Sequence, residues 1–84
     1  MSSKTAIVGS TVGLHARPAA VIAAAAIEYE DPIFLSFGGN SVSAASTLLI
    51  MSLGAEHLAE VTVESQNADA VERLASLIEQ NLDD

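Results

Sequence analysis

The sequence predicts an α+β fold in which three helices cover one face of a four-stranded antiparallel sheet, in the order β-α-β-β-α-β-α. Short β-branched or alternating runs are typical of strands, and apolar residues at three-and-four spacing between them are typical of helices. At 84 residues, the chain has the length of one small domain, which we expect to span 1–84. The apolar helix stripes need a surface to pack on, so one sheet face is expected to be covered and the other to face water.

A proline indicates where the first helix begins. A β-branched run at 4–8 predicts the first strand, and an alanine-rich segment with apolar residues at helical spacing, Ile27 among them, predicts a helix over 16–30. Pro18 lacks a backbone N–H and is tolerated only in the first turn of a helix. The helix therefore has to begin close to His15.

The middle of the chain predicts a hairpin. The segment 31–37 alternates in the way a half-buried strand does. Gly-Gly-Asn at 38–40 accepts positive φ angles, and an extended pattern resumes at 41–43. A fourth strand is expected over 59–65, where valines alternate with polar residues.

Two further helices have recognisable ends. The stretch 46–54 is expected to form a short helix that starts at or near Ser46 and is closed by Gly54 in the left-handed conformation. The last helix has Asn67 as its expected N-cap. Its apolar stripe consists of Val71, Leu74, Ala75, Ile78 and Leu82.

Composition excludes several classes of function. Eleven acidic residues stand against three basic ones, a net charge of −8, which disfavours binding to nucleic acid or to an anionic membrane surface. No segment approaches the roughly 18 apolar residues of a membrane span, and there is no cysteine for disulfides or thiolate metal sites. We expect a monomeric protein of the cytoplasm with no metal, no cofactor, no nucleic-acid partner and no membrane insertion.

The segment GLHARPAA at 13–20 places His15 where a helix begins. The N-terminus of a helix presents unpaired N–H groups and favours negative charge. The amides of Ala16 and Arg17, together with the Arg17 guanidinium, could therefore bind a phosphoryl group carried by His15. A histidine at a helix start can also be a solvated cap, so the residues by themselves leave the phosphate-handling and structural interpretations open.

The segments VGLHARPAA and SVSAASTLLIMSLGA closely resemble the histidine-containing phosphocarrier (HPr) family of the phosphoenolpyruvate-dependent sugar phosphotransferase system. The resemblance covers nearly the whole chain and implies that family's open-faced sandwich. It also implies that His15 accepts a phosphoryl group on Nδ1 from phosphorylated enzyme I and passes it to the enzyme IIA domains of sugar transporters. Such a protein is a carrier with transferase-type chemistry and does not turn over a substrate alone.

The same resemblance implies roles for other residues. Arg17 would stabilise the phosphoryl charge, and Ser46 falls where some members carry a regulatory phosphoserine made by a dedicated kinase. A partner-docking surface would include Ala20, Thr47, Leu48 and Met51. We expect Leu49 and Ile50 to belong to the core instead.

The sequence departs from the family at positions that usually carry a hydroxyl or a positive charge. Ala16 replaces a serine or threonine, and Ala45 replaces a lysine. Residues that are often basic in the family are apolar here, at Ala24, Ile27 and Leu49. Docking is therefore expected to depend on apolar contact and on Arg17.

Two other functions remain open on the sequence. A phosphocarrier of a nitrogen-related regulatory branch would share the chemistry, and a small non-catalytic α+β module would share only the element order. His57 is interpreted as a surface turn residue. Together with His15 and the nearby Glu56 and Glu60, it does not form a ligand set at metal spacing.

Overall fold

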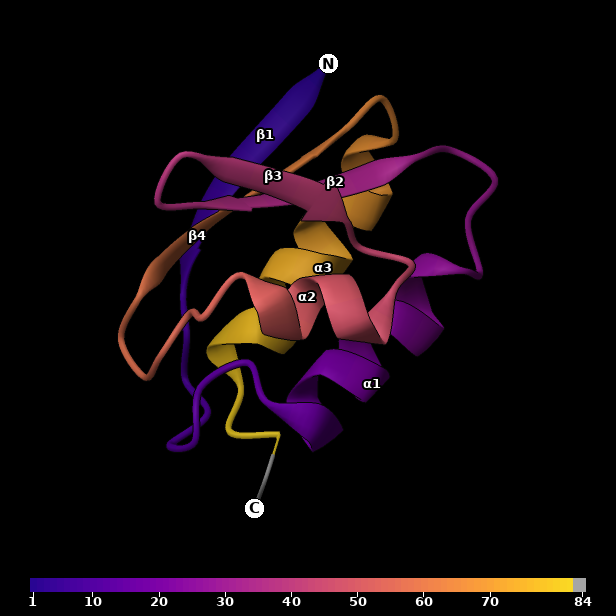
Figure 1. Cartoon of the computed structure of the whole chain (residues 1–84). Coiled ribbons are helices and arrows are strands. Elements are labelled where there is room, and N and C mark those ends of the chain that lie inside the picture. The colour runs from indigo at the N-terminus through magenta and orange to yellow at the C-terminus, as the bar shows by residue number, and fades with distance from the viewer. Residues whose placement is uncertain (83–84) are drawn as a thin grey trace.

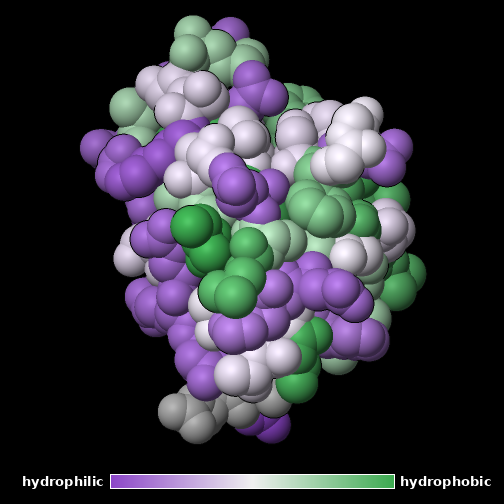
Figure 2. Space-filling model, turned by 90° about the vertical axis from the view of Figure 1, so that its left-hand side faces the viewer, coloured by the Kyte–Doolittle hydropathy of each residue, from purple (hydrophilic) through white to green (hydrophobic). Residues whose placement is uncertain are grey.

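The computed structural model describes residues 1–82, and its elements follow the predicted order (Figure 1). Residues 83–84 of the predicted domain lie outside the described residues. The view from the side of β4 and the loop before it shows apolar groups set among hydrophilic ones (Figure 2). The elements are β1 (Ser2–Ile7), α1 (Ala16–Ala26), β2 (Ile33–Phe37), β3 (Asn40–Ser43), α2 (Thr47–Ser52), β4 (Glu60–Ser65) and α3 (Ala68–Glu79).

The four strands form one antiparallel sheet in the order β1-β4-β2-β3. The predicted hairpin joins β2 to β3 through Gly38 and Gly39, whose φ angles are +60° and +84°. Positive φ at both central residues is the geometry of the tight turn that matches strand twist, and glycine adopts it without strain. The outer face of the sheet bears hydroxyls, and Thr5 on β1 and Thr62 on β4 are hydrogen-bonded at 3.1 Å.

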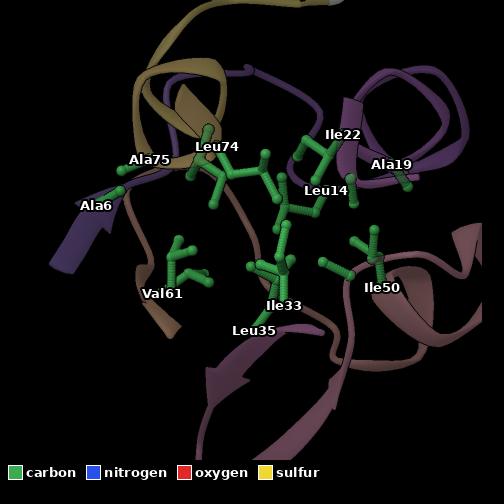
Figure 3. Close-up of a cluster of buried hydrophobic side chains, with 14 of the residues drawn as sticks. Ala6, Leu14, Ala19, Ile22, Ile33, Leu35, Ile50, Val61, Leu74 and Ala75 are labelled. Carbon is green, nitrogen blue, oxygen red and sulfur yellow. The ribbon is translucent and has the colours of Figure 1, made fainter. Parts of the chain in front are cut away.

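The helices lie together on the other face of the sheet and enclose an aliphatic core (Figures 1 and 3). Val61 and Val63, predicted to point inward from β4, are fully buried. The fold class predicted from the sequence is therefore confirmed. The largest fully buried side chains include Ile22, Leu35, Ile50, Leu74 and Ile78.

Helix α1 packs on this core through small side chains and ends four residues earlier than predicted. The helix stops at Ala26, and the N–H groups of Glu28 and Tyr29 each donate to a carbonyl three residues back, at 3.2 Å. This tightening turns the chain away from the core, so that Ile27 is 68% exposed. The buried face of α1 consists of Pro18, Ala19, Ile22, Ala23, Ala25 and Ala26.

The predicted caps of α2 and α3 are confirmed. Ser46 Oγ accepts a hydrogen bond from the Leu49 N–H at 3.2 Å, and Gly54 follows α2 with a φ of +69°. Asn67 Oδ1 accepts from the Ala70 N–H at 3.2 Å. Because α3 ends at Glu79, the predicted stripe residue Leu82 lies beyond the helix, where it packs half-buried against the core.

The prediction for α2 was right for Ile50 and wrong for Leu49. Ile50 is completely buried, whereas Leu49 is 44% exposed and Leu48 is 77% exposed. Successive residues of a helix point about 100° apart, so a helix that lies flat on a core buries one side of such a run and exposes the other. The surface of α2 is consequently more apolar than the sequence indicated.

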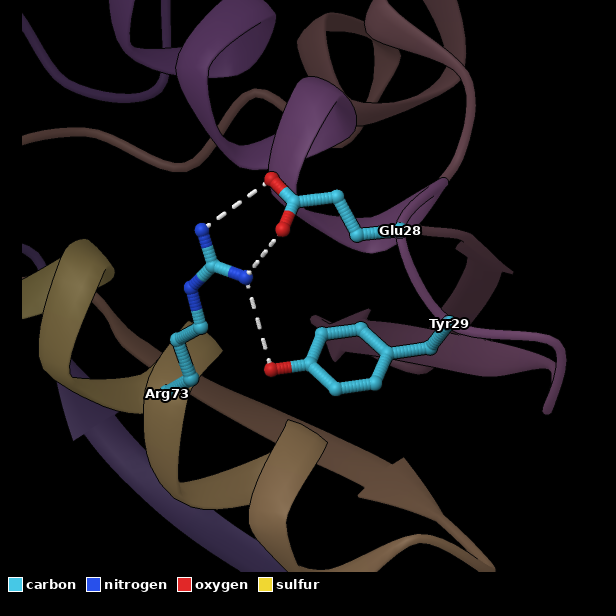
Figure 4. Close-up of polar contacts among 3 residues, drawn as sticks. All are labelled: Glu28, Tyr29 and Arg73. Carbon is cyan, nitrogen blue, oxygen red and sulfur yellow. Dashed lines mark hydrogen bonds and ion pairs between the residues drawn. The ribbon is translucent and has the colours of Figure 1, made fainter.

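Two of the three basic residues are held in ion pairs. Lys4 Nζ lies 2.9 Å from Glu72 Oε1. Arg73 donates to both carboxylate oxygens of Glu28, at 2.9 and 3.2 Å, and to the Tyr29 hydroxyl at 3.4 Å (Figure 4). The hydrogen bonds between the two side chains lower the pKa of Glu28 and raise the pKa of Arg73. This contact joins α3 to the C-terminal end of α1.

Within residues 1–82, no helix combines the length and the apolar character that crossing a bilayer requires. Over the same range, no cluster of three or more histidine, aspartate and glutamate side chains could hold a metal ion.

Candidate functional site

The loop between β1 and α1 brings His15 against the segment that follows α2. The Leu14 N–H donates to the Ala55 carbonyl at 2.9 Å. Gly13 adopts a φ of +76°, and a Cβ atom on it would lie 2.7 Å from the Ala55 oxygen and 2.9 Å from Glu56 Cα. Only glycine combines this φ with so close an approach. The position of His15 relative to residues 54–56 is thereby set by backbone contact.

His15 is the N-cap residue of α1, and its imidazole is exposed. Its backbone is extended, with φ −87° and ψ −165°, and its side chain makes no capping hydrogen bond. The His15 carbonyl accepts the Ala19 N–H at 2.8 Å, which starts the helical hydrogen-bonding pattern. The earlier N–H groups of the first turn, those of Ala16 and Arg17, have no carbonyl inside the helix to bind, and Pro18 has no N–H. His15 therefore stands next to two free donors.

The imidazole borders two depressions in the surface. The wider one has a volume of about 680 Å³ and is lined by Val12, His15, Ala16, Arg17 and Pro18. The smaller one, of about 170 Å³, lies between His15 and the end of α2. Its other lining residues are Val12, Leu14, Met51, Gly54, Ala55 and Glu56.

Arg17 is the cation of this site. Its side chain is exposed and lines the wider depression with His15. Among residues 1–82, it is the basic residue that forms no ion pair, because Lys4 and Arg73 are engaged with glutamates. The guanidinium is thus available to an anion in a chain whose net charge is −8.

The other predicted site residues lie on α1 and α2 or at their ends, and these two helices pack against each other below the strands in the view of Figure 1. Ala20 and Leu48 are exposed, and Thr47 and Met51 are half-buried. Met51 lines the smaller depression, whereas Ser46, at the opposite end of α2, lines neither of the two. The structure therefore brings Met51 to His15 but leaves Ser46 apart from it.

Sequence reasoning did not find Val12 or Glu56, which border the imidazole. Glu56 belongs to a loop more than forty positions away in the sequence, which the Gly13 and Leu14 contacts hold beside His15. The glycine at position 13 is the local sequence signal that could have indicated the close approach of another backbone here, because it stands just before His15 and the helix start at Pro18.

The family model described as "PTS HPr component phosphorylation site" matches residues 2–80. The chain belongs to the HPr phosphocarrier family of the phosphotransferase system. HPr from Bacillus anthracis is 32% identical, with 92% of this chain and 95% of that chain covered, and its TM-score is 0.85. HPr from Thermoanaerobacter tengcongensis is 31% identical over 100% and 98% of the two chains, with a TM-score of 0.89.

A third similar structure is that of a dimeric protein. Crh, the catabolite repression protein of Bacillus subtilis, is 33% identical over 98% of each chain, with a TM-score of 0.73, and its crystal structure is a domain-swapped, intertwined dimer. These likenesses extend over nearly the full length of each relative. The chain thus shares its architecture with these two HPr proteins and with Crh, which forms a dimer in its crystal structure.

Proposed function

We propose that this protein accepts a phosphoryl group on His15 Nδ1 from phosphorylated enzyme I and passes it to enzyme IIA domains. The observation that carries the proposal is the exposed imidazole at the N-terminus of α1, beside the one unpaired basic residue among residues 1–82. Membership of the HPr family supplies the reaction class. The non-catalytic module considered from the sequence would give no reason for this arrangement.

The reaction needs an accessible nitrogen lone pair and stabilisation of phosphoryl charge. The neutral imidazole attacks phosphorus, a P–N bond forms, and the bond between phosphorus and the donor breaks, leaving its electron pair on the donor. In this proposal, the amides of Ala16 and Arg17 and the Arg17 guanidinium bind the phosphoryl oxygens, which the exposed start of α1 and the shared depression support. Transfer to a IIA acceptor repeats the same steps with the imidazole as leaving group.

Docking is proposed to use the exposed sides of α1 and α2 around His15. The residues are Ala20, Thr47, Leu48 and Met51, and the exposure of Ile27 and Leu49 enlarges the apolar part of this surface. With alanine at position 45, the charge contribution is reduced to Arg17. The partners of this protein are therefore expected to present an apolar surface to it.

Regulation, location and assembly remain part of the proposal. Ser46 caps α2 beside the proposed docking surface, where a phosphate would oppose docking because its charge would have to be desolvated against an apolar partner. We place the protein in the cytoplasm as a monomer that folds as one domain over 1–84.

The test is phosphorylation with enzyme I and phosphoenolpyruvate. The parent protein should gain one acid-labile, alkali-stable phosphate, and His15→Ala should gain none. His57→Ala is the matched control, because His57 is the other exposed histidine and lies in the turn after α2. Label retained by His15→Ala would overturn the assignment, and no labelling of the parent would favour the non-catalytic alternative.

A further inference from the structure

A second apolar surface lies outside the proposed docking face. Ile7, at the end of β1, is 48% exposed, and Leu58, in the turn before β4, is 66% exposed. The two are neighbours because the Leu58 N–H donates to the Val8 carbonyl at 2.9 Å. We call this pair the Ile7–Leu58 patch. Neither residue lines the two depressions beside His15.

Local structure does not account for a leucine at position 58. Its φ is +73°, and no other non-glycine residue among 1–82 has a positive φ. Glycine or asparagine adopts this conformation readily, whereas a branched side chain is strained in it. Leu58 also contributes little to the core, since two-thirds of its surface is in water. Strain combined with exposure of a large apolar group points to contact with another molecule.

Carboxylates surround the patch. Glu60 is directly opposite Ile7 in the β1–β4 pairing, and Glu79 Oε2 accepts a hydrogen bond from the Ile7 N–H at 3.3 Å. Glu56 belongs to the same turn as Leu58 and also lines the smaller depression beside His15, so the two surfaces adjoin. The side of the molecule that bears the loop before β4 shows apolar groups enclosed by hydrophilic ones (Figure 2).

Among residues 1–82, none of these three carboxylates forms an ion pair with a basic side chain. The nearest lysine along the chain, Lys4, is paired with Glu72 on α3. An apolar centre with an acidic rim is complementary to an apolar side chain flanked by lysine or arginine.

We propose that the Ile7–Leu58 patch is a docking surface for a protein segment that inserts an apolar side chain and carries lysine or arginine on both sides of it. The surface is separate from the α1 and α2 face that is proposed to meet enzyme I. The acidic rim selects basic partners and repels acidic ones, the reverse of the selection expected around Arg17.

The probe is a synthetic amphipathic peptide with leucines on one side and flanking lysines, together with a twin in which glutamates replace the lysines. Titrated into the isotope-labelled full chain, the lysine peptide should shift the amide resonances of Ile7 and of residues 57–60. The glutamate twin should not bind. Leu58→Asn, which suits the left-handed backbone, should weaken the peptide about fivefold while leaving phosphorylation of His15 unchanged.

Two controls locate the effect. Leu48→Asn removes a more exposed leucine from the other face and should leave the affinity for the peptide unchanged. Replacing both Glu60 and Glu79 by glutamine should weaken binding and flatten its salt dependence. The proposal is overturned if the peptide does not bind, if the shifts fall on α1 and α2, or if the twin binds equally well. Concentration-dependent shifts at the patch without peptide would overturn it in favour of a second copy of the chain.

Discussion

Substitutions at Ser46 should separate the stability of α2 from the docking of partners. Ser46→Ala removes the oxygen that accepts the Leu49 N–H at 3.2 Å, at the start of a helix of only six residues. Loss of such an N-cap costs about 1 kcal/mol. In a chain of 84 residues, this corresponds to a fall in Tm of roughly 4–8 °C.

Ser46→Asp should behave differently, because it retains a side-chain acceptor. A carboxylate at the positive end of a helix contributes about 0.3–1 kcal/mol, so the Tm should stay close to that of the parent. The same charge stands beside the exposed apolar surface of α2, where a docking partner would have to strip water from the carboxylate. Phosphorylation of His15 by enzyme I should therefore be slower in Ser46→Asp and nearly unchanged in Ser46→Ala, provided that the protein is folded.

Thermal unfolding by circular dichroism at neutral pH and initial rates of phosphoryl transfer at 25 °C measure the two effects on the same samples. The Tm of Ser46→Ala should be lower than the Tm values of the parent and Ser46→Asp. The transfer rate of Ser46→Asp should be lower than the rates of the parent and Ser46→Ala. Equal Tm values for the parent and Ser46→Ala would refute the capping argument. Equal transfer rates for the parent and Ser46→Asp would refute the electrostatic one.

Four further outcomes are expected. In urea unfolding, Gly13→Ala should lower the free energy of unfolding more than Gly38→Ala. Both substitutions incur about 1–2 kcal/mol of left-handed strain, but only the Cβ at position 13 meets a neighbouring backbone. Equal losses of unfolding free energy would contradict the close-contact argument. Arg17→Lys should slow phosphoryl transfer and Arg17→Ala should slow it further without changing the Tm, and equal rates for all three proteins would mean that the helix N-terminus suffices. Binding to enzyme I, measured by calorimetry, should weaken little between low and physiological salt, and a steep fall would argue against apolar docking. The hydrogen bond to Arg73 lowers the pKa of Glu28 from 4.5, so the ion pair stabilises the fold above pH 4.5 and this stabilisation is lost as pH falls through the lowered pKa. The free energy of unfolding of Glu28→Gln should therefore fall less on acidification than that of the parent. Equal falls for the two proteins would contradict this.

Features with a local cause could be predicted from the sequence. Pro18 marked the start of α1, the paired glycines marked the hairpin, and Ser46 and Asn67 marked the starts of α2 and α3, because each signal acts within a few residues. The end of α1 was missed because no glycine or proline stands between Ala26 and Pro32, and the first residues of that segment are compatible with a helix.

Features set by distant contacts could not be predicted. The run of apolar residues in α2 is too short to show which side is buried, so Leu49 was placed inside. The walls of the candidate site at Val12 and Glu56 depend on the contact between Gly13 and the segment after α2, which joins distant parts of the chain. The left-handed turn at Leu58 has no sequence signal, since leucine is among the residues least suited to it.

The small side chains beneath α1 restrict how this protein can change over evolution. Ala19 and Ala23 pack against the core with almost no exposed surface, and an alanine has no rotamer that could adjust to a new neighbour. A larger residue at either position has to push the whole helix outward, which costs about 1–3 kcal/mol and carries His15 away from residues 54–56. The volume of the side chains on the inner face of α1 therefore fixes where His15 lies, although these side chains are remote from the imidazole in function. The outer side, where Ala24 and Ile27 are exposed, is free of this restriction on volume.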